Sequence, residues 1–149
     1  MEHTVNPKKL FGREETERIA ASVAEAEKTT SAEIKVVVLG HSWQDIRDTA
    51  ARVFRRHGLH NTRERNAVLI LLVLANHEFL VYGDEGVHKH VRQAFWDDVR
   101  DAIASRLAQG RFCEGLCEGV RLIGDRLRRH FPPIENQPNT IPNEPILDH

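Results

Sequence analysis

A small group of polar side chains could bind a metal ion or a phosphate group if the fold brings them together. Most of them carry the oxygen ligands that Ca2+, Mg2+ and Mn2+ prefer, whereas zinc favours nitrogen and sulfur. The remaining one is an arginine, which pairs with carboxylates or grips phosphate. The residues in question are Glu33, Asn66, Asp84, Glu85, Asp97, Asp98 and Arg65. Whether they meet depends on the elements that carry them.

Hydrophobic periodicity predicts alternating strands and helices along most of the chain. Apolar runs at 34–39, 67–75 and 78–82 are typical of strands, with a tight turn at 76–77 between the last two. Helical spacing predicts helices over 14–28 and 45–57, and two more within 95–107 and 116–127. We therefore expect an α/β fold, a three-layer αβα sandwich. A parallel β-α-β unit and a hairpin would form a small mixed sheet, flanked by about four helices.

This order of elements places the polar group at one edge of the sheet. Strands joined by a crossing helix run parallel, so the strands 34–39 and 67–75 begin at the same edge. The hairpin reverses the chain, and the strand 78–82 therefore ends there too. The residues at that edge are Glu33, Arg65, Asn66, Asp84 and Glu85, with Asp97 and Asp98 near the start of the next helix. Carboxylates gathered so closely raise one another's pKa or recruit a cation.

Simpler explanations compete with a metal site. Acids at strand ends and helix N-termini commonly cap free backbone N–H groups, and Arg65 could form a salt bridge instead of holding phosphate. His88 and His90 could add nitrogen ligands or a general acid, whereas His57 and His60 suit a helix end. The chain has no glycine-rich phosphate loop and no recognisable serine–histidine arrangement, which disfavours a covalent hydrolase.

Several motifs in a fixed order resemble the TPM domain. They are EKTTSAEI at 27–34, RNAVLI at 65–70, GDEG at 83–86, the pair Phe95-Trp96, the closing GL and GV pairs at 115–116 and 119–120, and Phe131-Pro132. The resemblance covers roughly 11–132, and it implies an αβα sandwich. It also implies divalent-cation binding, as in several members, and the acid phosphatase activity proposed for plant thylakoid members. Asp84 matches the family's Gly-Asp aspartate, and Glu33 matches the glutamate after its small-residue turn.

Composition adds expectations about organisation and location. Residues 1–10 should form a flexible leader, 11–132 the folded domain and 133–149 a disordered tail rich in proline and asparagine. A formal net charge of -1 gives no case for a nucleic-acid surface. The chain shows no secretory signal and no apolar run of the roughly 20 residues that span a bilayer, so we expect a cytoplasmic protein. Within the family that it resembles, many members have both segments, and the chain looks like the small free-standing bacterial type. Cys113 and Cys117 are interpreted as small buried residues.

These observations favour a module that binds a divalent cation, with Ca2+ expected first and Mg2+ or Mn2+ as alternatives. The expected ligands are Glu33, Asp84, Asp97 and Asp98, with Glu85 and Asn66 secondary. One alternative is a metal-assisted acid phosphatase in which Arg65 helps to hold a phosphorylated small molecule. Another is a metal-free scaffold that binds a protein partner. The sequence does not identify catalytic residues.

Overall fold

Apolar strands lie at the centre of the molecule. The computed structural model describes residues 6–134 and 141–148. β1 (Glu33–Leu39), β2 (Ala67–Val73), β3 (Glu78–Gly83) and β4 (Ile146–Asp148) form one sheet in the order β3-β2-β1-β4. β1 is parallel to β2 and β4, and β3 is antiparallel to β2, so the expected mixed sheet is confirmed. β1 and β2 are buried on both faces, which explains why almost every residue in them is apolar.

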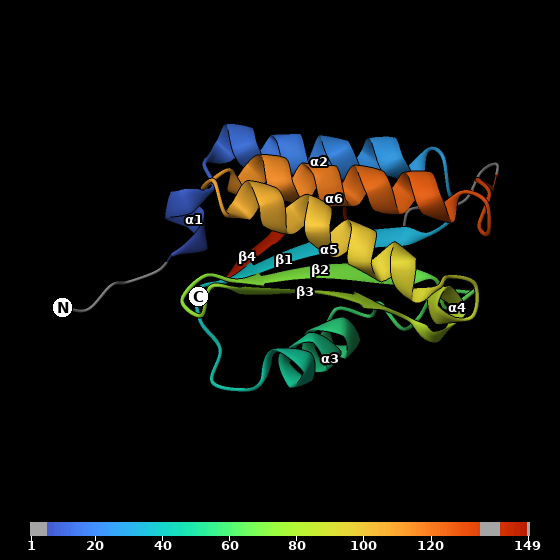
Figure 1. Cartoon of the computed structure of the whole chain (residues 1–149), viewed down its shortest axis with the longest axis horizontal. Coiled ribbons are helices and arrows are strands. Elements are labelled where there is room, and N and C mark those ends of the chain that lie inside the picture. Colours follow the sequence, from blue (N-terminus) through green and yellow to red (C-terminus); the bar gives the residue numbers. More distant parts are fainter. Residues whose placement is uncertain (1–5, 135–140, 149) are drawn as a thin grey trace.

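Helices cover both faces of this sheet. α2 (Arg13–Glu27), α5 (Gln93–Leu107) and α6 (Phe112–Leu127) lie on one face, and α3 (Ile46–Arg56) lies on the other (Figure 1). The three-layer sandwich is thereby confirmed. Two short helices that the sequence did not predict, α1 (Pro7–Leu10) and α4 (Glu85–His88), lie at opposite ends of the sheet. In the described part of the chain, no helix is both long and apolar enough to cross a bilayer.

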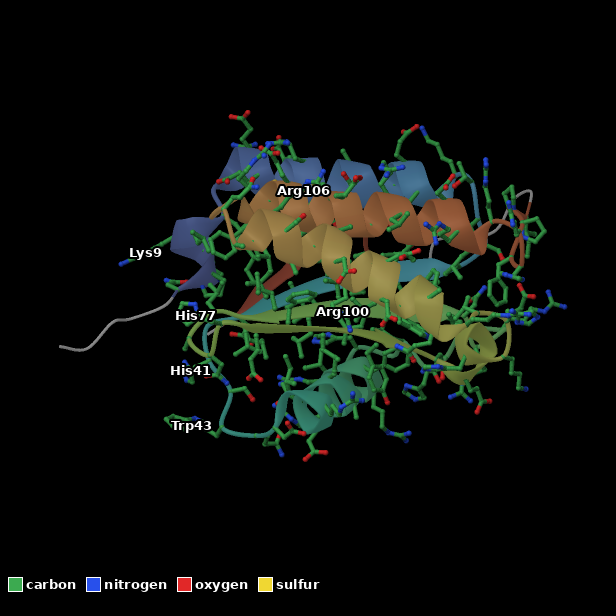
Figure 2. The ribbon with its side chains drawn as sticks, in the orientation of Figure 1. Lys9, His41, Trp43, His77, Arg100 and Arg106 are labelled. Carbon is green, nitrogen blue, oxygen red and sulfur yellow. The ribbon has the colours of Figure 1, made fainter. Side chains whose placement is uncertain are left out.

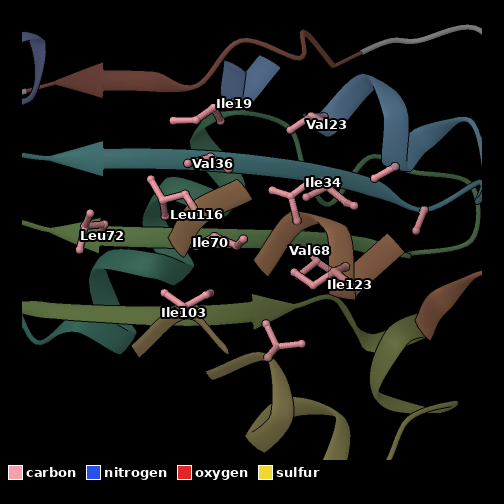
Figure 3. Packing of buried hydrophobic residues seen from close by; sticks show 14 of the residues in the cluster. Ile19, Val23, Ile34, Val36, Val68, Ile70, Leu72, Ile103, Leu116 and Ile123 are labelled. Carbon is pink, nitrogen blue, oxygen red and sulfur yellow. The ribbon is translucent and has the colours of Figure 1, made fainter. Parts of the chain in front are cut away.

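The strands feed two hydrophobic clusters, one on each side of the sheet. Ile34 and Val36 point toward α2, α5 and α6, whereas Val37 belongs to the cluster under α3. Figure 3 shows the larger cluster, in which side chains from β1 and β2 meet those of the three helices. Because successive strand residues face opposite ways, the same alternation fixes which polar residues reach which face.

The C-terminal segment corrects one expectation. Residues 146–148 form β4 and pair with β1, and the amide of Gly40 donates to the carbonyl oxygen of Asp148 over 2.8 Å. Ile141 is also buried, at 7 % exposure. The disordered tail expected over 133–149 is therefore wrong for 141–148, because β1 would otherwise leave a row of unpaired backbone groups at the sheet edge. Residues 135–140 and 149 lie outside the described residues.

The N-terminal leader differs in part as well. Residues 1–5 of the expected flexible leader lie outside the described residues. Pro7–Leu10 forms α1, whose first turn is capped because Asn6 Oδ1 accepts a hydrogen bond from the Lys8 amide at 3.0 Å.

Candidate functional site

Arg65 stands in an unusual backbone conformation just before β2. Its φ is 52°, in the left-handed region that few residues other than glycine adopt. The loop is fixed on both sides, since the Asn66 amide donates to Thr62 Oγ1 at 3.1 Å and the Gly86 amide donates to the Arg65 carbonyl at 2.9 Å. Such strained positions persist where the surroundings enforce them, and they cluster at functional sites.

The Arg65 side chain forms a two-pronged ion pair with Asp84. Nε donates to Asp84 Oδ2 at 2.7 Å and Nη2 donates to Oδ1 at 2.8 Å, while Nη1 reaches Glu85 Oε1 at 3.3 Å. The Asp84 side chain is only 7 % exposed, and it also accepts the Glu85 amide at 2.8 Å. The hydrogen bonds that Arg65 donates to Asp84 are the main reason why the pKa of Arg65 is raised. Two parallel charge-assisted bonds orient both groups.

This pair borders a cavity of about 340 Å3 between α3, the end of β3 and α4. Positively charged and imidazole side chains line it together with the two carboxylates, and Phe54 and Tyr82 supply apolar walls. The polar lining residues are Arg55, His60, Arg65, Asp84, Glu85 and His88. His60 Nδ1 is buried and has no hydrogen-bond partner among the described residues.

Trp96 lies beside this cavity. Its ring centroid is 4.9 Å from that of His88, a lining residue. Trp43, in contrast, is 94 % exposed and lies at the other end of the molecule from α4 (Figure 2). Fluorescence from Trp96 can therefore report on the cavity, and a Trp43→Phe background isolates that signal.

The other expected ligands are dispersed. Asp97 accepts a hydrogen bond from Gln93 within α5 at 3.0 Å, and Asp98 forms an ion pair with Arg126 of α6 at 2.9 Å. Asn66 is buried next to Arg65 and does not line the cavity. The described residues contain no group of three or more His, Cys, Asp or Glu side chains that could hold a metal ion.

Glu33 does not line the cavity either, and its side chain has a different partner. It lies on β1, opposite Ala67 of β2, and its carboxyl group forms a hydrogen bond with that of Glu27 at the end of α2. Burial raises the pKa of both groups, that of Glu27 to about 8. The topology argument therefore correctly brought Arg65, Asp84, Glu85 and Glu33 to one edge, since the Asp84 amide donates to the carbonyl of Ala67, the residue opposite Glu33. Glu33 nevertheless does not line the cavity.

Sequence reasoning missed two contributors to the cavity. Arg55 lies in the last turn of α3, where the helix dipole explains a basic residue, and from the sequence alone the same explanation applies to His60. A signal was available, because the loop that follows α3 leads directly to Arg65 and must bring these residues to the same edge.

The sequence and the fold are both similar to those of known proteins. A model of the TPM domain matches residues 4–126. The chain belongs to the TPM domain family. Curated proteins gave no match.

Solved structures of bacterial proteins share the TPM fold. The BA42 protein from the psychrophilic bacterium Bizionia argentinensis is 33 % identical, with a TM-score of 0.89, and the match covers 95 % of this chain and 97 % of that one. An N-terminal domain from P. gingivalis is 20 % identical, with a TM-score of 0.68 and coverage of 82 % and 79 %. The N-terminal domain of cg2496 from Corynebacterium glutamicum is 14 % identical, with a TM-score of 0.63 and coverage of 85 % and 82 %. The two more distant structures show the fold alone.

Removing the Arg65 side chain tests the ion pair directly. Arg65→Ala should lower the midpoint of thermal unfolding, because the nearly buried Asp84 carboxylate would lose its counter-charge. The neighbouring, exposed Arg63 provides the control, and Arg63→Ala should leave the midpoint almost unchanged. Equal midpoints for the two variants would show that the pair adds nothing to stability.

Proposed function

We propose that the cavity beside Arg65 and Asp84 binds a phosphate group together with a divalent cation, and that the TPM domain hydrolyses phosphomonoesters there. One observation carries the proposal: the strained Arg65 is fixed on a nearly buried carboxylate inside a cavity lined by a second arginine and two histidines. A volume of about 340 Å3 suits a small ligand.

Phosphate binding requires hydrogen-bond donors for the phosphate oxygens, and the cavity lining supplies them. Arg55 supplies a guanidinium group whose planar fork matches phosphate oxygens, and Arg65 supplies its Nη1. His60 and His88 also line the cavity and supply imidazole rings that can hold or transfer a proton, so that one of them can protonate a leaving alcohol. Asp84 keeps Arg65 oriented toward the cavity while Nη1 of Arg65, bound to the exposed Glu85, remains free to exchange partners.

The carboxylates present restrict which cation the cavity can bind. Calcium takes six to eight oxygen ligands, and the described residues offer no such cage. Asp84 and Glu85 instead fit the pattern of Mg2+ or Mn2+, which bind through one or two carboxylates and take their other ligands from substrate phosphate and water. When bound, the cation would neutralise phosphate charge and polarise a phosphoryl oxygen. Glu33, Asp97 and Asp98 have no part in this arrangement.

Hydrolysis has separate support from the family, since the matching family model is named TPM_phosphatase. Without turnover, the same cavity would be a binding module for phosphorylated ligands.

The thermal midpoint with Mg2+, Mn2+, Ca2+, phosphate or chelator tests binding. A ligand that binds only the folded state must raise the midpoint. Mg2+ or Mn2+ together with phosphate should raise that of the wild type, with a change in Trp96 fluorescence in the Trp43→Phe background. Asp84→Asn should abolish both effects, and Asp101→Asn, an exposed acid on α5, should preserve them. If Asp84→Asn is poorly folded, Glu85→Gln at an exposed position serves instead.

Turnover is measured on p-nitrophenyl phosphate. Asp84→Asn should reduce kcat/KM by at least about 100-fold, which is a typical loss when an electrostatic group of an active site is removed. Activity that survives in this variant would indicate a contaminating enzyme. Midpoints unaffected by every ion would overturn both parts of the proposal and leave a scaffold for a protein partner.

A further inference from the structure

A second cluster of ionisable groups lies under the C-terminal segment, apart from the phosphate cavity. Glu27 at the end of α2 accepts a hydrogen bond from the Ile34 amide at 2.9 Å. This bond holds its carboxyl group against β1 beside Glu33, with whose carboxyl group it interacts. Glu33 is 5 % exposed, and its Oε2 has no hydrogen-bond partner among the described residues. Two carboxyl groups can share a hydrogen bond only if at least one of them carries a proton.

Lys35 connects this pair to the C-terminal segment. It is 3 % exposed, and its ammonium group donates to the carbonyl oxygens of Pro142 at 2.8 Å and Glu144 at 2.6 Å. These bonds lie just before β4, whose three residues complete the edge of the sheet. A buried ammonium group therefore fastens a short strand that otherwise has few backbone bonds.

We propose that Glu27 and Glu33 form a binding site for one proton, and that its occupancy controls the docking of residues 141–148 on β1. With one shared proton, the pair has a single negative charge that balances Lys35. Loss of that proton leaves two neighbouring carboxylates, which attract the Lys35 ammonium away from the segment and repel the Glu144 carboxylate. The segment is held in the protonated state and released in the deprotonated one.

The surrounding charges are consistent with this assignment. Burial raises the pKa of Glu27 and of Glu33, so that a proton stays bound at neutral pH, and burial lowers the pKa of Lys35. The strand β2 next to β1 contains no titratable residue. Glu144 of the segment interacts with Lys35, as does His57 after α3, and His57 in turn interacts with Asp148 of the segment.

Hydrogen exchange of the full chain tests the proposal. Peptides covering 141–148 are followed by mass spectrometry between pH 6 and pH 9, with rates corrected for intrinsic exchange. Their protection in the wild type should fall at least tenfold over this range, since one linked proton changes an equilibrium by up to about tenfold per pH unit. Protection of 141–148 should fall more steeply with pH than protection in α5, which follows the global stability, and this difference separates local release from global unfolding.

Variants distinguish release controlled by the carboxyl pair from opening of residues 141–148 that does not depend on it. Glu33→Gln should remove the pH dependence, and Glu27→Gln should do the same if the first variant folds poorly. Lys35→Met should lower the protection of 141–148 at every pH. Glu25→Gln, at an exposed position of α2, should behave as the wild type. The proposal would be overturned if protection of 141–148 in the wild type did not change with pH. It would also be overturned if protection in Glu33→Gln and Glu27→Gln fell with pH as much as in the wild type.

Discussion

Replacing Gly86 by alanine is expected to lower the free energy of unfolding by about 2–4 kcal/mol, because overpacking against rigid neighbours forces the backbone to move. The new Cβ would overlap the carbonyl oxygen of Glu64 and lie 2.6 Å from that of Arg65. Both are backbone atoms, so no side-chain rotation relieves the overlap. The Gly86 amide also holds the Arg65 loop, and we therefore expect Gly86→Ala to lose the ligand-induced shifts of the cavity.

Urea unfolding followed by circular dichroism measures this cost. Gly12→Ala is the matched control, since an added Cβ there comes no closer than 3.7 Å, to Glu15 Oε1. As a change at a helix N-cap, it should cost less than about 1 kcal/mol. Equal stability of the two variants would show that α4 tolerates displacement from the Arg65 loop.

The second large effect is a loss of stability with rising pH. Burial raises the pKa of Glu27 from 4.5 to about 8, so the folded chain holds a proton that the unfolded chain has released. Stability is fully present below about pH 4.5, falls between the two values and is lost once the pH passes the folded value of about 8. The slope for one proton is at most about 1.4 kcal/mol per pH unit.

Urea unfolding at pH 5, 7 and 9 gives this slope. At pH 5, the free energy of unfolding of Glu27→Gln should be equal to or lower than that of the wild type. Toward pH 9, the difference should shift steadily in favour of the variant. Glu25→Gln, exposed on the same helix, should follow the wild-type profile. Parallel profiles for wild type and Glu27→Gln would show that Glu27 titrates normally. Measurements stop at pH 9 because Lys35, whose pKa burial lowers, contributes with the opposite sign as it loses its proton.

Most of the fold could be predicted because its elements are long and periodic. β2 is an uninterrupted apolar run, β1 is apolar apart from Glu33 and Lys35, and the three long helices on one face repeat apolar residues at helical spacing. β4 could not be predicted, because three residues in a proline-rich stretch carry no period of their own. Only the open edge of β1 gives that stretch an extended conformation.

The candidate site was predictable to the extent that backbone topology determines it. Parallel strands and a hairpin brought Arg65 and Asp84 together, as expected. Side-chain partners decided the rest: Asp98 is paired with Arg126, and Glu33 with Glu27. Those partners come from helix faces whose rotation about the helix axis a sequence pattern locates only coarsely.

The pairing of β1 with the C-terminal segment also has a consequence during protein synthesis. Lys35 and its partner Glu144 are 109 positions apart, so β1 leaves the ribosome long before the strand that closes its edge. At about 5–20 residues per second, that edge waits on the order of 5 to 20 seconds for its partner. Throughout this interval the nascent chain presents an apolar strand with one open side, the surface that chaperones shield and neighbouring chains join. A ribosome that stalls before residue 141 would keep the edge of β1 unpaired and therefore prone to aggregation.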